Sequence, residues 1–360
     1  MKKSILIFSI FVGLLLSNLK GTAQSTSADS LLNFIQQNKY TSSFYLKKND
    51  SVIAHLNQNK MMPLASTAKI IIAIEFAKQA SHNLFNENEL ISLDEINKYY
   101  IPNTDGNAHP HWIEYERQKG NIINDSVPLI EVAKGMIVFS SNANAEFMMD
   151  LLGINNINSN LRLLGLTDHT QLYPWASALF LYQNPQHIKE EKIIREIKKL
   201  DDEQYAKAAF FIHNQLKNNI AYKLKFRPQD LSIAMQREWS DRLPASTTKE
   251  YVRICDILNN REIFDKKTYA VLSQVLETLM ENPANQSWLV HAGMKAGSTM
   301  YVLTEALYAT LKNGTKIEMA YFFNDLTQKE NDQLQKWMNS FDLKILTDES
   351  FRKKLAASSD

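Results

Sequence analysis

Short apolar runs separated by turn residues lie near both ends of this chain of 360 residues. Near the N-terminal end, Phe44-Tyr45-Leu46 and Val52-Ile53-Ala54 lie on either side of Asn49-Asp50. Aromatic and β-branched residues favour strands, and Asn and Asp favour turns, so this stretch predicts a β-hairpin.

Three further strands are predicted near the C-terminal end, at residues 288–294, 303–311 and 317–323. Asn313-Gly314, between the last two, is typical of a tight hairpin turn. Residues 325–340 then predict a closing helix.

Between these strand regions the apolar positions recur at helical spacing. We expect a helix from Ser66 through Ala77, one with Ser126 as N-cap that runs through Ile137, and one from about Asn144 to Leu152 that stops at Gly153. We also expect amphipathic helices with a solvated charged face over 186–222, a helix opened by a capping box at Thr247–Glu250, and a polar loop over 102–111. This order predicts an α+β fold with an antiparallel sheet built from both chain ends. An all-helical region, about residues 76–245, is inserted between them.

The first 24 residues are typical of a signal peptide. Lys2 and Lys3 precede an apolar run from Ile5 to Leu16, and small residues follow at Gly21-Thr22-Ala23. The apolar run is shorter than the roughly 20 residues that a membrane span needs. We therefore expect a periplasmic or secreted protein without a stable membrane anchor, in which residues 25–360 form one catalytic domain.

Composition excludes some functions. A net charge of +1 gives no excess of positive charge with which to bind nucleic acid. Separately, we expect the protein to be a monomer. The single cysteine, Cys255, cannot form an intrachain disulfide, and its apolar neighbours indicate a small buried side chain. His109 and His111, near Asp105, lack a further ligand at a recognisable spacing. We therefore assign no metal and no cofactor.

Three short motifs carry candidate chemistry. Ser66 and Lys69 are three residues apart, so a helix places them on one face, and the apolar run that follows indicates that this helix is buried. A lysine beside a serine in a poorly solvated place can make that serine a nucleophile. Ser140-Ser141-Asn142 lies at a junction of two predicted helices, and Lys295-Ala296-Gly297-Ser298 closes a predicted strand.

In this order the motifs resemble the S-x-x-K, S-D-N and K-T-G set of the serine β-lactamase and penicillin-binding protein superfamily, nearest to the class A β-lactamases. The resemblance covers nearly the whole chain after the signal peptide and implies a β-lactamase/transpeptidase-like fold. Taken singly, each motif is explained as well by a snorkelling lysine, a helix cap or a strand charge.

The resemblance also implies roles for these residues. Ser66 would form an acyl-enzyme, with Lys69 as its base or as the holder of the proton network. Ser140 would pass a proton to the leaving nitrogen. The backbone N–H groups of Ser66 and Ser298 would form the oxyanion hole. Substrate would be bound by Asn142, Lys295, Gly297 and Ser298.

The sequence departs from the family pattern in three places. Ser141 replaces the aspartate of S-D-N, and Ala296 replaces the threonine of K-T-G. Between Thr167 and Lys189 there is no glutamate to activate the deacylating water, and Asp168 is a poor match. Loss of a general base slows its step by roughly 10²–10⁴-fold.

The function expected is therefore that of a serine acyl hydrolase, similar to a class A β-lactamase, acting on a β-lactam or a peptidoglycan-derived substrate. Two alternatives use the same residues. One is a D,D-peptidase or esterase, and the other is a penicillin-binding or sensor protein that does not turn over.

Overall fold

The computed structural model describes residues 21–184, 188–357 and 359. These residues divide into two compact units. We call residues 21–67, 162–170 and 245–359 the sheet unit, and residues 68–161 and 171–244 the helical unit. The first 20 residues of the predicted signal peptide lie outside the described residues, and its last four begin helix α1 (Gly21–Gln37). Within the described ranges, no helix combines the length and apolar character that a membrane span requires.

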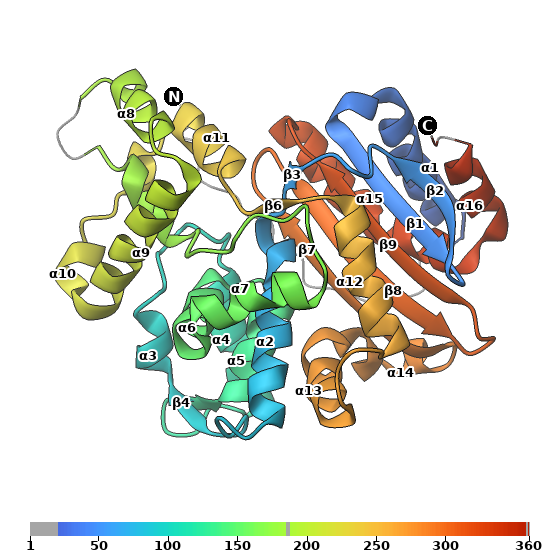
Figure 1. Ribbon diagram of the computed structural model, residues 1–360, viewed down its shortest axis with the longest axis horizontal. Helices are drawn as coiled ribbons and strands as arrows, with labels where there is room; N and C mark the ends of the chain where they lie inside the picture. The colour runs from blue at the N-terminus through green and yellow to red at the C-terminus, as the bar shows by residue number, and fades with distance from the viewer. Residues whose placement is uncertain (1–20, 185–187, 358, 360) are drawn as a thin grey trace. The chain divides into compact units, whose positions relative to one another are not determined.

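The centre of the sheet unit is a five-stranded sheet in the order β2-β1-β9-β8-β7, with antiparallel neighbours (Figure 1). Its strands are β1 (Ser42–Lys48), β2 (Ser51–Leu56), β7 (Leu289–Ser298), β8 (Leu303–Leu311) and β9 (Lys316–Phe323). β1 pairs with β9, so the two ends of the chain build one sheet, as predicted. Both predicted hairpins are confirmed. Asn49 and Asp50 have φ of 49° and 65°, and Gly314 has φ of 84°, the left-handed values that tight hairpin turns need.

Helices cover both faces of this sheet (Figure 1). α1, α15 (Gln328–Thr347) and α16 (Glu349–Ala356) pack on one face, and α12 (Thr248–Asn260) packs on the other. Two consecutive residues of β9 show the two layers. The Tyr321 ring meets Phe341 of α15 at 5.6 Å, and the Phe322 ring meets Tyr251 of α12 at 5.6 Å.

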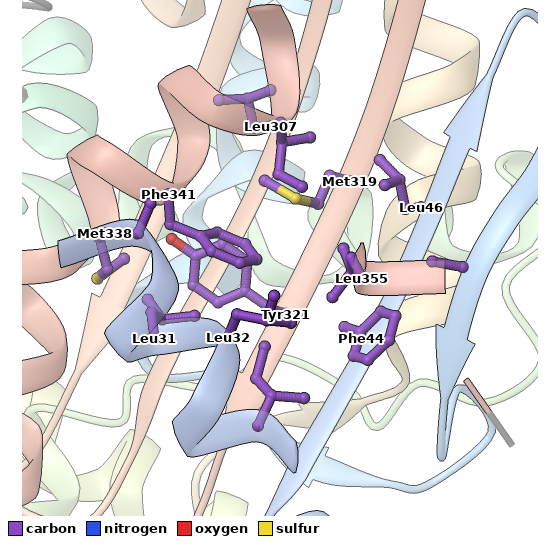
Figure 2. Packing of buried hydrophobic residues seen from close by; sticks show 14 of the residues in the cluster. Leu31, Leu32, Phe44, Leu46, Leu307, Met319, Tyr321, Met338, Phe341 and Leu355 are labelled. Carbon is purple, nitrogen blue, oxygen red and sulfur yellow. The ribbon is translucent and has the colours of Figure 1, made fainter. Parts of the chain in front are cut away.

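The core under α1 and α15 is continuous and apolar (Figure 2). Leu31 and Leu32 of α1, Met338 of α15, and Tyr321 and Met319 of β9 contribute to it, and all are buried. The sheet unit also contains short elements: β3 (Met62–Pro63) paired with β6 (Ala245–Ser246), α13 (Lys266–Leu276) and α14 (Pro283–Gln286). Cys255 of α12 is buried, as predicted.

The helical unit is built around α2 (Lys69–Ser81), which packs on α5 (Leu129–Val138) and α6 (Asn142–Leu152). Its other helices are α3 (Leu93–Asn97), α4 (Ala108–Lys119), α7 (Ile154–Leu163, which reaches the sheet unit), α8 (Glu190–Lys198), α9 (Asp202–Asn218), α10 (Ile220–Lys223) and α11 (Ile233–Asp241). A small ladder pairs β4 (Leu90–Ser92) with β5 (Ser126–Pro128). The predicted amphipathic helices are confirmed: α8 buries Ile193 and Ile197 beneath a charged outer face.

Three local predictions were wrong. The predicted 102–111 loop ends early, because α4 begins at Ala108 and contains both His109 and His111. Ser126 is no N-cap, because it lies in β5 and its hydroxyl donates to the main-chain oxygen of Asn124.

Thr247 does cap α12, accepting from the N–H of Glu250, but the reciprocal bond of a capping box is not formed. Glu250 Oε1 instead accepts from the N–H groups of Thr167, at 3.1 Å, and Asp168, at 3.3 Å. A distant segment of the chain therefore uses the side chain that a capping box requires.

Candidate active site

In the helical unit, Lys69 is fully buried at the start of α2. Its Nζ donates to the main-chain oxygen of Ser140 at 2.7 Å and to Oδ1 of Asn142 at 2.9 Å, and lies 3.4 Å from Oγ of Ser140. A buried ammonium or amine requires such acceptors, because leaving it unpaired in an apolar interior is costly. Three of the predicted site residues therefore form one cluster, which we call the lysine cluster.

The loop between α5 and α6 presents Ser140 and Asn142 to this lysine. Ser140 has φ of 64°, which is rare for a residue with a side chain. Ser141 follows as the N-cap of α6 and accepts from the N–H of Asn144 at 3.2 Å. Nδ2 of Asn144 in turn donates to the main-chain oxygen of Val132 on α5. A serine at position 141 thus supplies the capping oxygen that the loop needs.

In the sheet unit, Ser66 lies in a 3₁₀ turn at Ala65–Ala68. Ala65 has φ of 46°, so a second left-handed residue precedes the candidate nucleophile. Strand β7 approaches this turn very closely. A Cβ added to Gly297 would lie 2.5 Å from the backbone nitrogen of Ser66 and 2.7 Å from that of Thr67. Only glycine permits this approach, which brings the strand against the backbone N–H of Ser66.

Two threonine hydroxyls fasten the Ser66 turn to the sheet. Oγ1 of Thr67 lies 2.8 Å from Oγ1 of Thr304 on β8 and donates to the main-chain oxygen of Lys295 at 3.3 Å. Oγ1 of Thr304 also donates to the main-chain oxygen of Leu64 at 2.7 Å. Thr304 was missed by the sequence reading, because only the pairing of β7 with β8 brings it near the turn.

Lys295 itself is only 4% exposed, and its Nζ donates to the main-chain oxygen of Ala296 at 2.8 Å. Burial lowers the pKa of Lys295 to about 7, although the negative charge of Glu305 partly opposes this. Ser298 is the last residue of β7 and pairs with Leu303. Ser66, Lys295, Gly297 and Ser298 thus belong to one part of the sheet unit, which we call the serine cluster.

The structure brings the predicted site residues into these two clusters, each within its own unit. The two clusters are connected through the chain itself, since Ser66 of the serine cluster precedes Lys69 of the lysine cluster by three residues. Chemically, the lysine cluster holds an amine beside a hydroxyl and an amide. The serine cluster holds the hydroxyls of Ser66 and Ser298, the backbone of the edge strand β7 and the buried amine of Lys295.

The two histidines of α4 differ in their surroundings. His109 is buried, with Nε2 2.9 Å from Oδ1 of Asn97 and Nδ1 3.0 Å from Oγ of Ser141. Burial lowers the pKa of His109 to about 4, so its ring is neutral. His111 is exposed. Among the described residues, no group of three or more His, Cys, Asp or Glu side chains is arranged to hold a metal ion.

The segment that follows Thr167 has its own anchor, which sequence reasoning did not find. Glu146, one turn after Asn142 on α6, accepts from the N–H of Ser177 at 2.6 Å and from its hydroxyl. Nδ1 of His213 on α9 lies 3.1 Å from Oε2 of the same carboxylate. Asp168, the carboxylate that the sequence offers in this segment, is exposed.

Comparisons with known proteins agree with this architecture. The family model described as "Beta-lactamase enzyme family" matches residues 26–334. A class A beta-lactamase from Bacteroides cellulosilyticus DSM 14838 is similar in structure, with a TM-score of 0.53 and 16% identity over 91% of this chain and 99% of that one.

Two other solved structures are similar to the same degree. A beta lactamase from Burkholderia vietnamiensis has a TM-score of 0.52 at 10% identity, covering 93% of this chain and 100% of that one. A beta-lactamase from Chitinophaga pinensis DSM 2588 has a TM-score of 0.51 at 13% identity, covering 88% and 98%. At such identities the likeness shows the fold. No curated protein matches.

The family match spans most of the chain, and the antiparallel sheet with its helices has the fold of the solved relatives. The chain therefore belongs to the beta-lactamase enzyme family.

Proposed function

We propose that this protein is an exported serine hydrolase that forms an acyl-enzyme at Ser66 and opens β-lactam or related amide bonds. The observation that carries the proposal is the burial of Lys69 with its Nζ held by Ser140 and Asn142, three residues after a serine in a constrained turn. A buried amine so placed has little structural use and a clear chemical one.

In the proposed acylation, the neutral amine of Lys69 takes the proton of the Ser66 hydroxyl as Oγ attacks the carbonyl carbon. The backbone N–H groups of Ser66 and Ser298 stabilise the oxyanion, which is commonly the largest contribution to such catalysis. The hydroxyl of Ser140 gives its proton to the leaving nitrogen as the C–N bond breaks, and the Lys69 ammonium, whose Nζ lies 3.4 Å from Oγ of Ser140, returns the proton taken from Ser66 to Ser140.

Substrate binding uses the remaining residues. The amide of Asn142 has hydrogen-bonding capacity for a substrate amide. The Lys295 ammonium attracts a substrate carboxylate through its positive potential. Gly297 contributes no side chain, and it lets the backbone of β7 reach the turn that carries the nucleophile.

Deacylation distinguishes this chain from a fast β-lactamase. The segment from Thr167 to Lys189 has no glutamate, and Ser177 within it is bonded to Glu146. Without a glutamate in that segment to activate it, water should attack the ester slowly, and the acyl-enzyme should last longer. This favours a second candidate function, a D,D-peptidase or esterase that transfers or hydrolyses substrates other than β-lactams.

Turnover measurements separate these functions. Wild-type protein and Ser66→Ala are incubated with a penicillin, a fluorogenic ester and a peptide ending in D-Ala-D-Ala. Turnover of the penicillin that depends on Ser66 supports the lactamase. Much faster turnover of the ester or peptide supports the second candidate, and a permanent adduct on Ser66 supports a binding protein.

Export is tested independently of activity. The chain is expressed with its first 24 residues in a Gram-negative host, and the N-terminal residue of the periplasmic protein is determined. A mature chain that begins at Gln24 or Ser25 is expected. An intact Met1 in the cytoplasmic fraction would contradict export.

A further inference from the structure

The turn between β7 and β8 follows directly on Ser298, one of the two residues whose N–H groups stabilise the oxyanion in the proposed function. In this turn the N–H of Thr299 donates to the main-chain oxygen of Val302 at 2.9 Å. Hydrogen-bonded and non-hydrogen-bonded pairs alternate along an antiparallel ladder, so the next pair, Ser298 with Leu303, is a non-hydrogen-bonded one. Because β7 is an edge strand, the N–H of Ser298 points outward from the sheet and away from β8.

A side chain of α15 holds this turn. Asn331, in the first turn of that helix, is only 2% exposed. Its Nδ2 donates to the main-chain oxygens of Thr299 at 2.8 Å and Val302 at 3.1 Å, and lies 3.4 Å from the main-chain oxygen of Met300. One buried amide therefore bridges the two ends of the turn.

Further contacts fix the turn and the orientation of this amide. Oγ1 of Thr299 accepts from the N–H of Tyr301 at 3.1 Å, and the main-chain oxygen of Tyr301 accepts from the N–H of Leu326 at 3.1 Å. Oδ1 of Asn331 accepts from Nε2 of Gln335, one turn later on α15, at 2.5 Å. The oxygen of the amide thus faces the helix, and its nitrogen faces the turn.

The peptide group that carries the N–H of Ser298 is held from two sides. On one side, Oγ1 of Thr304, the hydroxyl that also fastens the turn of the candidate nucleophile, donates to the main-chain oxygen of Gly297 at 3.2 Å. On the other side, the chain enters the turn that Asn331 bridges. A donor stabilises an oxyanion best when its direction is fixed in advance, because no reorientation is then needed during the reaction.

We propose that Asn331 is a positioning residue for the oxyanion hole: by holding the β7–β8 turn, it fixes the direction of the Ser298 N–H. The inference rests on the proposed function, since only an oxyanion formed at Ser66 makes that direction matter for catalysis. Without the donors of Asn331 the turn can move, and the N–H of Ser298 is aimed less well. The acylation step should slow, whereas the affinity for substrate before acylation should change little.

The first experiment does not depend on activity. Asn331→Ala and Asn331→Leu both remove the donors, and the leucine keeps the volume of the side chain. Amide hydrogen exchange is followed by NMR at Thr299, whose N–H forms the backbone bond of the turn. In both variants we expect exchange at Thr299 to be roughly tenfold faster than in wild type, because the turn opens more often.

Asn259→Ala is the matched control. Asn259 is a buried asparagine of α12, and its Nδ2 donates to the main-chain oxygen of Ala309, toward the other end of β8, at 3.2 Å. The variant therefore removes a comparable bond from a buried amide to the same strand, away from the β7–β8 turn. It should leave exchange at Thr299 unchanged.

The second experiment tests whether the oxyanion is what Asn331 serves. Acylation of Ser66 is timed with a penicillin, an activated ester and the thiono analogue of that ester, whose sulfur accepts hydrogen bonds weakly. In both Asn331 variants we expect the acylation rate constants of penicillin and ester to fall roughly tenfold, with unchanged dissociation constants, since removing a whole oxyanion donor costs roughly 100- to 1,000-fold. The thiono analogue should lose much less, and Asn259→Ala should keep the wild-type ratio of ester to thiono analogue.

Unchanged exchange at Thr299 in folded Asn331→Ala and Asn331→Leu overturns the inference, and so does an unchanged acylation rate constant. An equal loss with the ester and its thiono analogue also overturns it, because Asn331 would then serve stability alone. A wild type that forms no Ser66 adduct with any of the three substrates overturns the proposed function and the catalytic part of the inference. Exchange at Thr299 then still decides whether Asn331 holds the turn.

Discussion

Nζ of Lys69 donates a hydrogen bond to the main-chain oxygen of Ser140 across 2.7 Å, and Ser140 adopts a φ of 64°. The left-handed conformation costs roughly 1–2 kcal/mol for a residue with a side chain. It persists because Lys69 holds the carbonyl on one side and Ser141 caps α6 on the other. Together with Ala65 before Ser66, it places backbone strain beside both candidate serines, as is common at functional sites.

Replacement of Gly297 by alanine should impair both stability and acylation. The added Cβ meets backbone atoms of Ser66 and Thr67, which cannot rotate away. We expect a loss of about 1–3 kcal/mol in the free energy of unfolding and more than a tenfold loss in the acylation rate. Urea denaturation and the rate of adduct formation by mass spectrometry measure the two effects.

Gly314→Ala is the matched control for Gly297→Ala. Its Cβ meets nothing within 4 Å, but its φ of 84° disfavours any side chain. It should cost stability at the β8–β9 turn and leave acylation unchanged. Equal acylation by Gly297→Ala and wild type would refute the close approach of β7 to Ser66 as a functional feature.

The charge of Lys295 should control the alkaline side of the pH profile. Burial lowers the pKa of Lys295 to about 7, so the ammonium is present below that pH and lost above it. The rate of acylation by a substrate with a carboxylate should fall roughly tenfold as the pH rises from 7 to between 8 and 9, because the charge of Lys295 disappears. In Lys295→Arg this fall should be absent, because the guanidinium stays charged. An identical alkaline limb in the two proteins would assign the limb to another group.

His213 should make the stability of the helical unit depend on pH. Burial disfavours its charged form, but bonds to Asp150 and Glu146 and their charges outweigh burial and raise the pKa of His213 to about 9. Because this value exceeds the unfolded value of about 6.5, the stabilisation is complete below pH 6.5 and is lost as pH rises through 9.

The shift corresponds to about 3 kcal/mol of unfolding free energy. Urea denaturation between pH 6 and pH 9.5 should show this loss in wild type and a flatter profile in His213→Gln. The exposed His82 provides the control His82→Gln, which should retain the wild-type profile. A wild-type profile in His213→Gln would show that this histidine stays neutral when folded.

The sequence predicted the sheet and most helices because their patterns are local. A short run of mostly apolar and aromatic residues marks β9, and Asn313-Gly314 marks the turn before it. Motif order also selected the residues that fill the two clusters. These signals need only neighbours along the chain.

What the sequence could not give depends on contacts between distant segments. Ser126 has the chemistry of a cap, but pairing of β5 with β4 places it in a strand. Glu250 is at the capping-box position, yet the N–H groups of Thr167 and Asp168 compete for it successfully. Thr304 acquires its role only because pairing of β8 with β7 brings its hydroxyl to the Ser66 turn.

The central claim is that Ser66 forms an acyl-enzyme, and intact-mass spectrometry tests it most directly. Wild-type protein and Ser66→Ala are incubated with a penicillin, and masses are recorded from seconds to hours. We expect a penicilloyl adduct on the wild type and no adduct on Ser66→Ala. The wild-type adduct should decay slowly, because the segment from Thr167 to Lys189 contains no glutamate. An equal adduct on folded Ser66→Ala, or none on folded wild type, would contradict the account.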